Sequence, residues 1–311
     1  MPLAPHPVTL RQLQYVVAVA DRKSFRKAAE DCNVSQPSLS AQIAQIEEAL
    51  GVVLFERDRR RVELTRAGQA LVERARGLLV AADELVASAR HYSDPFAGTL
   101  RVGVIPTLGP YLLPEIGPVL REQYPRLTFV WTEERTPTLV QKLGQAEIDA
   151  AIVALESGIG GLPHVVLGTD NFVFAASPSH PLSASRDPIK PEDLEGERVL
   201  LLEDGHCFRE QALSYCARAG AEEAGYRATS LTTLIQITAG GACVTLLPSL
   251  AVALENRRGA LRIRPFAPRV PARTLALVWR RNAALEATLR PVGETLHRAY
   301  ADIAERAARP A

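Results

Sequence analysis

The chain has 311 residues, with 36 lysines and arginines against 35 aspartates and glutamates, and 47% of its residues are hydrophobic. This length is too great for one ordinary core and predicts two or three domains, while the balanced charge excludes binding to nucleic acid through overall charge alone. We expect a soluble, cytoplasmic protein, because no apolar run reaches about 18 residues and residues 1–7 lack a basic stretch followed by an apolar one.

The first 66 residues predict a compact helical unit with a hairpin. Ser24 is placed to cap one helix, and residues 33–34 supply a tight turn after it. A second helix is expected to begin with Ser35 as its N-cap and with Pro37 in its first turn, where a missing N–H costs little. Two helices joined in this way are typical of a helix-turn-helix, whose second helix enters the major groove of DNA.

The second helix of this pair has an apolar face and a polar face. The apolar residues are Val34, Leu39, Ile43 and Ile46, and the polar residues that then project outward are Gln36, Ser38 and Gln42. Polar side chains at the N-terminal end of such a helix reach base edges, and the helix dipole favours a nearby phosphate.

A basic segment follows, from Leu54 to Gly68. The alternation around its arginines predicts two short strands and a wing that lies along a sugar–phosphate backbone. An arginine run alone is more often a solvated turn, so this interpretation depends on the helix-turn-helix before it. The residues expected to contact double-stranded DNA are Ser35, Gln36, Pro37, Ser38, Gln42, Arg57, Arg59, Arg60 and Thr65.

A long helix with an apolar stripe is predicted after the hairpin. Its apolar residues recur at alternating spacings of four and three: Leu71, Ala75, Leu78, Ala82, Leu85 and Ala89. A single amphipathic helix lying on its own domain would show the same pattern, but the neighbouring unit is too small to cover a helix of this length. We therefore expect pairing between two chains, and a linker at residues 94–98, where proline and glycine break the pattern.

The remainder of the chain alternates strands with helices, which indicates open α/β sheets. The predicted strands are 100–105, 127–131, 150–155, 199–202, 243–247 and 275–279. Ligands of such sheets bind at the carboxyl ends of strands, beside helix N-termini. Thr107, Thr136 and Cys207 all fall at strand-to-helix turns, so we expect them to converge on one cleft.

Four cysteines in a cytoplasmic protein are normally reduced, and Cys32 and Cys243 lie in apolar patterns typical of a core. Cys207 and Cys216 are nine positions apart, which in a helix separates them by roughly 13 Å along the axis. A disulfide tolerates a Cα separation of only about 4.4 to 6.8 Å, so the helix between them would have to be dismantled before they could join. The spacing alone leaves two interpretations open: a redox switch that changes shape, or two unrelated buried thiols.

Several motifs together carry a resemblance to a known family. Residues 25–68 include Ala28-Ala29, Ser35 to Ser40, Leu54 to Arg57 and Leu64 to Gly68, and they resemble the DNA-binding domain of the LysR-type transcriptional regulators. The chain is most similar to the members of that family that sense hydrogen peroxide. The similarity runs from about Leu10 to Arg280 and includes residues 105–114, 202–207, 227–230 and 245–248, together with Cys216.

The resemblance implies a winged helix-turn-helix over residues 1–68, a dimerising linker helix over 69–93, and an effector region of two α/β lobes like type II periplasmic binding proteins. Lobe I would comprise residues 98–170 and 272–311, and lobe II, with the redox cysteines, residues 171–271. It also implies a homodimer that assembles into a homotetramer on promoter DNA, with hydrogen peroxide as the signal and cytosolic thiol reductants to reset the protein. RNA polymerase is a further expected partner, and no cofactor or metal is expected.

The same resemblance implies that peroxide attacks Cys207 and that Cys216 resolves the product as a disulfide, which rearranges the oligomer. It places Thr107, Thr136, His206, Gln211 and Arg280 around the peroxide. Thiolate attack on one oxygen expels the other as hydroxide, so the site needs donors and positive potential, which we expect from a helix N-terminus and Arg209. Structural roles are the alternative: a helix cap for Thr136, an exposed position for Gln211 and a carboxylate pair for Arg280.

Three other functions compete with a peroxide sensor. A LysR-type regulator of a small organic acid would keep the DNA-binding half but would not need Cys216. A thiol peroxidase would use both cysteines but leave the helix-turn-helix without a role. A metal sensor that used His206 and the two cysteines lacks a fourth ligand at a zinc-like spacing.

Overall fold

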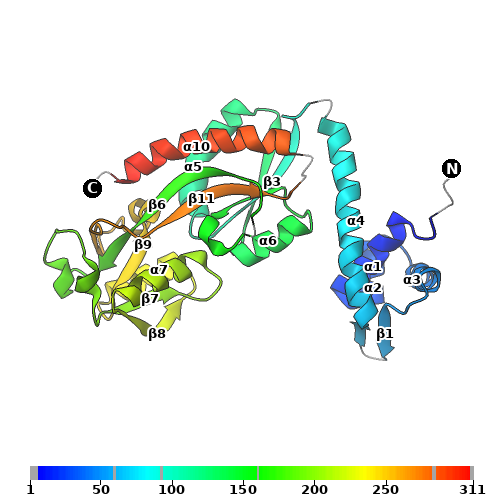
Figure 1. Cartoon of the computed structure of the whole chain (residues 1–311), viewed down its shortest axis with the longest axis horizontal. Coiled ribbons are helices and arrows are strands. Elements are labelled where there is room, and N and C mark those ends of the chain that lie inside the picture. The colour runs from blue at the N-terminus through cyan, green and yellow to red at the C-terminus, as the bar shows by residue number, and fades with distance from the viewer. Residues whose placement is uncertain (1–5, 59–60, 92–93, 160, 282–284, 309–311) are drawn as a thin grey trace. The chain divides into compact units, whose positions relative to one another are not determined.

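A computed structural model describes residues 6–58, 61–91, 94–159, 161–281 and 285–308 (Figure 1). The chain forms two compact units, Met1–Arg90 and His91–Ala311. The first is a winged helix-turn-helix with a long helix, and the second is a mixed α/β structure, so the predicted fold class is confirmed. No helix within the described ranges is long and apolar enough to span a membrane.

The first unit contains the predicted helix pair and hairpin. Its elements are α1 (Leu10–Arg22), α2 (Phe25–Asp31), α3 (Gln36–Leu50), β1 (Phe55–Asp58) and β2 (Arg61–Leu64). The Ser24 side chain accepts from the backbone N–H of Lys27, and that of Ser35 accepts from the N–H of Ser38, so both serines are N-caps as predicted. Between the helices Asn33 adopts a positive φ of 53°, which makes the tight turn.

The apolar face predicted for α3 is the core of this unit. Leu39, Ile43 and Ile46 are almost completely buried, and they pack with side chains from α1, α2 and the hairpin. Because these contacts fix the rotation of α3, the opposite side of its first turn faces solvent.

Helix α4 (Arg66–His91) begins three residues before the predicted start. Val72 belongs to the core of the first unit and Ala75 is also buried, whereas Leu78 and Leu85 are 57% and 73% exposed. The N-terminal turns of the helix therefore pack on its own unit. The exposed leucines further along agree with an apolar stripe that faces another chain.

Gly68, in the first turn of α4, touches the hairpin so closely that no side chain fits. A Cβ built at this residue would lie 2.1 Å from the carbonyl oxygen of Leu54. We expect Gly68→Ala to lower the free energy of unfolding of the first unit by about 1–3 kcal/mol, because α4 and the strand must move apart. Circular dichroism during urea unfolding measures this loss.

The matched control is Gly77→Ala, since a Cβ at Gly77 meets no atom within 4 Å. An alanine there is expected to stabilise the helix by about 0.5–1 kcal/mol relative to glycine. Equal effects of the two substitutions would show that the contact with Leu54 does not constrain this turn.

The second unit contains all six predicted strands and three more. The predicted ones are β3 (Gly98–Val104), β4 (Leu127–Glu133), β5 (Ala150–Ala154), β7 (Arg198–Leu202), β9 (Thr245–Pro248) and β11 (Ala272–Trp279). The additional strands are β6 (His164–Ala176), β8 (Glu222–Ala228) and β10 (Arg262–Arg264). Polar residues interrupt all three, which hid them from a search for apolar β-branched runs.

Strand β6 connects the two halves of the main sheet, whose order is β10-β6-β11-β5-β3-β4, with β9 also paired to β6. Residues 164–171 of β6 pair with β11, and residues 172–176 pair with β9 and β10. Parallel strands β7 and β8 form a second sheet. The helices of this unit are α5 (Gly109–Gln123), α6 (Thr136–Gly144), α7 (Cys207–Arg218), α8 (Leu231–Ala239), α9 (Ser249–Glu255) and α10 (Glu286–Ala308), and α10 packs along β6 and α5 (Figure 1).

Candidate functional site

Cys207 is the first residue of α7, directly after the turn that follows β7. Gly205 in that turn has a φ of +91°, a conformation that glycine adopts without strain, and His206 is the helix N-cap. The thiol therefore lies where unpaired backbone N–H groups and the helix dipole favour negative charge. This is the position predicted for a reactive thiolate.

The helix predicted between the two cysteines is present and intact. Cys207 and Cys216 both lie within α7, both are buried, and both are free thiols. Nine residues of helix separate them by about 13 Å along the axis, far more than a disulfide allows. The two sulfurs can bond only after α7 unwinds between them.

Burial also makes the thiol of Cys216 unreactive. Removal from water raises the pKa of Cys216 to about 12, because the charged thiolate is poorly solvated inside the protein. Since the thiolate is the nucleophile, Cys216 is unreactive as long as α7 is folded.

Three of the predicted pocket residues carry buried polar atoms without a hydrogen-bond partner among the described residues. These atoms are Thr136 Oγ1, His206 Nε2 and Gln211 Oε1. An unpaired buried polar atom costs about 1–3 kcal/mol, so these three atoms are available to bind a polar ligand or a water molecule. Arg135, not Thr136, is the N-cap of α6, so the hydroxyl of Thr136 does not serve as a helix cap.

The carboxylate of Glu156, in the short 3₁₀ helix Leu155–Ser157, links α7 to β11. Gln211 Nε2 donates to one carboxylate oxygen over 3.1 Å, and the backbone N–H of Thr274 donates to the other over 2.8 Å. Gln211 is four residues after Cys207 and therefore lies on the same face of α7. This fixes its amide beside the reactive turn instead of in solvent.

Thr107 is held by an arginine that the sequence reasoning missed. Arg273 Nη1 donates to Thr107 Oγ1 over 2.7 Å, and Nη2 donates to the Thr107 carbonyl over 2.9 Å. Because Thr107 Oγ1 accepts a hydrogen bond from Arg273, its own proton points away from Arg273 and is available to a ligand. Arg273 is completely buried and forms an ion pair of 2.8 Å with Asp170.

Arg280 was predicted in the pocket, and the structure places it elsewhere. Its Nη1 donates to the carbonyls of Leu143 and Ile148, at the end of α6 opposite to Thr136. Arg280 follows the last residue of β11 whereas Arg273 is near the first, so about 23 Å of strand separate them. The guanidinium that meets Thr107 therefore belongs to Arg273, and not to the Arg280 that the resemblance implied.

Arg209 does not supply the free positive charge expected beside Cys207. Its guanidinium is buried and pairs with Asp204 at 2.9 Å and with both carboxylate oxygens of Glu223 at 2.9 and 3.0 Å. Arg227 pairs with the same two carboxylates, which closes a network of four charges. Because a buried arginine needs such partners, the charge of Arg209 is balanced within this network.

His206 is held in its neutral form. Burial and the nearby positive charge of Arg135 lower the pKa of the imidazole below its ordinary value, although Glu203 acts in the opposite direction. In the neutral ring one nitrogen donates to the backbone of Thr229, so the buried and unpartnered Nε2 is left as an acceptor for an O–H group of a ligand.

The predicted DNA-contact residues divide into three groups. Ser35, Gln36, Pro37 and Ser38 are exposed in the first turn of α3, and Gln42 is half-buried. Arg57 lies in β1, and Arg59 and Arg60 lie outside the described residues. The hydroxyl of Thr65 donates to the Val53 carbonyl over 2.7 Å and accepts from the Gly68 N–H, so it has no proton for a phosphate and its role is structural.

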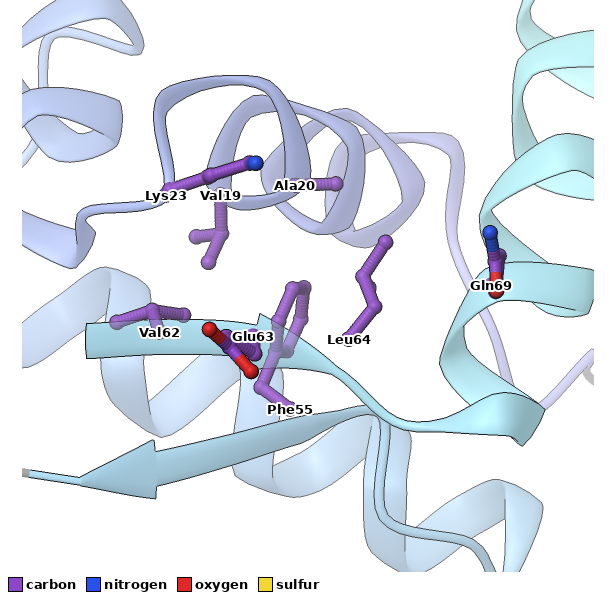
Figure 2. A pocket seen from close by; sticks show the side chains of 8 residues that line it. All are labelled: Val19, Ala20, Lys23, Phe55, Val62, Glu63, Leu64 and Gln69. Atoms are coloured by element: carbon purple, nitrogen blue, oxygen red, sulfur yellow. The ribbon is translucent and has the colours of Figure 1, made fainter.

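A pocket of about 260 Å³ lies in the first unit, whereas Cys207 belongs to the second unit. Figure 2 shows its lining, which α1, the hairpin and the start of α4 supply: Val19, Ala20, Lys23, Phe55, Val62, Glu63, Leu64 and Gln69. The lining contains neither a cysteine nor a histidine, so it offers no thiol chemistry. Within the described ranges, no group of three or more histidine, cysteine or acidic side chains is arranged to hold a metal ion.

Comparison with known proteins matches both units. Residues 10–69 match the bacterial regulatory helix-turn-helix of the lysR family, and residues 93–301 match the LysR substrate binding domain. The hydrogen peroxide-inducible genes activator of Pectobacterium carotovorum subsp. carotovorum is 40% identical over 290 residues, which cover 93% of this chain and 96% of that protein.

Two solved structures are similar over nearly the whole chain. Full-length OxyR from Pseudomonas aeruginosa is 33% identical, with a TM-score of 0.72 and 95% of both chains covered. A cysteine-to-serine variant of Corynebacterium glutamicum OxyR with hydrogen peroxide bound is 34% identical, with a TM-score of 0.66 and coverage of 98% of this chain and 96% of that one.

Proposed function

Because this chain belongs to the LysR family of bacterial transcriptional regulators, we propose that it is a DNA-binding regulator that senses hydrogen peroxide through Cys207. The observation that carries this proposal is the set of unpartnered buried atoms on Thr136, His206 and Gln211, next to a thiol at a helix N-terminus. Hydrogen peroxide is small, and each of its oxygens donates and accepts, so it suits such mixed donors and acceptors.

The proposed reaction has two steps. The Cys207 thiolate attacks one peroxide oxygen, the O–O bond breaks, and the other oxygen leaves as hydroxide, which leaves Cys207 as a sulfenic acid. We propose that Thr107 and Thr136 donate to the leaving oxygen, that His206 Nε2 accepts a proton of the peroxide, and that Arg273 orients Thr107. The Cys216 thiol then displaces water from the sulfenic acid and forms a disulfide.

The second step ties the chemistry to a change of shape. Cys216 reaches Cys207 only when α7 unwinds, so oxidation replaces a helix by a loop. We propose that this change rearranges the oligomer and its promoter contacts, and that cytosolic thiol reductants reverse it. Peroxide reduction would then be a stoichiometric sensing step, not enzymatic turnover.

The wider assembly is also part of the proposal. The exposed Leu78 and Leu85 of α4 support a homodimer through residues 69–93, which would assemble into a homotetramer in the cytoplasm and contact RNA polymerase. The exposed N-terminal turn of α3 supports promoter recognition by residues 1–68. We propose lobes of residues 98–170 with 272–311, and of 171–271, for the effector region.

Cys216→Ser is expected to leave peroxide reduction intact and to remove the disulfide. The sulfenic acid of Cys207 should accumulate after one equivalent of peroxide, with a first-step rate constant within about 3-fold of wild type, because Cys216 plays no part in that step. Dimedone labelling with mass spectrometry detects the sulfenic acid.

In wild type the same peroxide treatment should form a disulfide, which removes two hydrogens from the peptides that contain Cys207 and Cys216. Free thiols that persisted at both positions would refute the proposed function.

A further inference from the structure

Arg135 bridges two segments that flank the proposed peroxide pocket. Its Nη1 donates to the carbonyl of Asp204 over 3.0 Å, and its Nη2 pairs with the carboxylate of Glu203. Arg135 precedes α6, whereas Glu203 and Asp204 belong to the turn between β7 and Cys207. One side chain thus ties the N-terminus of α6 to the turn that carries the reactive thiol.

The Arg135 side chain also lies against the backbone of this turn. A Cβ built on Gly205 would be 3.2 Å from Arg135 Cδ and 3.5 Å from Nη1. The guanidinium therefore covers Gly205 closely, and a larger residue there would displace it. This packing is independent of the ion pair with Glu203.

Exposure shows on which side of the pocket Arg135 lies. Thr136 and His206, its neighbours on the two segments, are only 4% and 6% exposed, and both carry an unpartnered polar atom. The Arg135 side chain is 42% exposed. Arg135 therefore lies nearer to solvent than its two buried neighbours, at the point where the two segments meet.

Resting on the proposed function, we propose that Arg135 is a positioning residue that straps the Glu203–Gly205 turn to α6, holds Thr136 beside Cys207, and restricts the pocket to the smallest hydroperoxide. The strap acts through geometry, because Thr136 and His206 can both bind the peroxide only if both stay at hydrogen-bond distance from it. It also explains why a half-exposed arginine makes two kinds of contact with one turn: a bidentate fork fixes orientation better than a single charge does.

The test compares two oxidants on the reduced full-length protein. The rate constants for Cys207 oxidation by hydrogen peroxide and by cumene hydroperoxide are measured for wild type, Arg135→Gln, Arg135→Lys and Glu203→Gln. Arg306→Gln is the matched control, because Arg306 forms a half-exposed ion pair with Glu115 away from the site. All variants are expected to fold, since exposed ion pairs contribute little to stability.

Arg135→Gln is expected to slow the reaction with hydrogen peroxide by about 10-fold or more and to lower the preference for hydrogen peroxide over cumene hydroperoxide. Glu203→Gln should shift the preference in the same direction. Combining Arg135→Gln with Glu203→Gln should change the preference little more than Arg135→Gln alone, because the two residues act as one strap. Arg135→Lys should recover part of the rate, and Arg306→Gln should match wild type.

Alkylation of Cys216 by iodoacetamide separates the strap from a general loosening of α7. It should stay as slow in Arg135→Gln as in wild type, because the helix remains folded. If Arg135→Gln left the preference between the two oxidants unchanged, the strap would be overturned and the proposed function would stand. The same conclusion would follow if both oxidants reacted equally more slowly with Cys207 while iodoacetamide alkylated Cys216 faster than in wild type. A wild-type Cys207 that does not react with hydrogen peroxide would overturn both.

Discussion

Replacing Cys207 with serine is expected to abolish the response to peroxide. A serine hydroxyl is far less acidic than a thiol and does not attack the O–O bond, so the rate of peroxide reduction should fall by more than about a thousandfold, as when other nucleophiles are removed. The remaining contacts of the turn, including those of Arg135 and Arg209, do not involve the sulfur, so the variant should fold normally. Stopped-flow measurement of peroxide consumption, with promoter footprinting before and after peroxide, checks both expectations.

The control for this prediction is Cys32→Ser, in the first unit. Cys32 is half-buried at the end of α2 and belongs to a different unit from Cys207, so its removal should leave the peroxide response unchanged. A Cys207→Ser protein that still changed its footprint with peroxide would place the sensing thiol elsewhere.

Arg273→Met is expected to destabilise the second unit by about 3–5 kcal/mol. The substitution removes one partner of a fully buried ion pair and leaves the carboxylate of Asp170 uncompensated, while Ser249 and the Leu250 N–H only partly satisfy it. Both tryptophans of the chain, Trp131 and Trp279, lie in this unit, so fluorescence during denaturant unfolding follows it selectively.

Two further variants test whether the loss of stability in Arg273→Met comes from the unpaired charge of Asp170. Arg306→Met removes an exposed ion pair and should change the free energy of unfolding by less than about 1 kcal/mol. Arg273→Met combined with Asp170→Asn should recover part of the loss, because no unpaired charge remains. If Arg273→Met lowered the free energy of unfolding no more than Arg306→Met does, water or a neighbouring cation would have to compensate the charge of Asp170.

Much of the fold follows from local sequence patterns. Ser24 and Ser35 cap their helices because a serine before an apolar-periodic segment satisfies a free backbone N–H, whatever the rest of the chain does. The predicted strands were apolar runs that the sheet buries. Strand β6 was missed because one of its faces meets Arg273 and α10, so that buried Asp170 occupies a position where a core residue was expected.

The candidate site was predictable where one segment carries its chemistry and unpredictable where distant segments meet. Cys207, His206 and Gln211 lie on one turn and one helix, so spacing suffices to bring them together. Arg273 reaches Thr107 from 166 residues away, and only the register of β11 shows that this arginine, and not Arg280, meets Thr107. The pairing of Arg209 with Asp204 and Glu223 depends likewise on how β8 packs beside α7.

The four-charge network around Arg209 exists only while α7 is folded. Arg209 lies between the two cysteines, so in the proposed oxidised state its guanidinium would withdraw and leave the carboxylates of Asp204 and Glu223 with Arg227 as their one shared cation. Two anions that share one cation repel, and this repulsion would favour the return of the helix once the proposed disulfide is reduced. Added salt weakens that restoring force, so the balance between thiol and disulfide should move toward the disulfide as ionic strength rises.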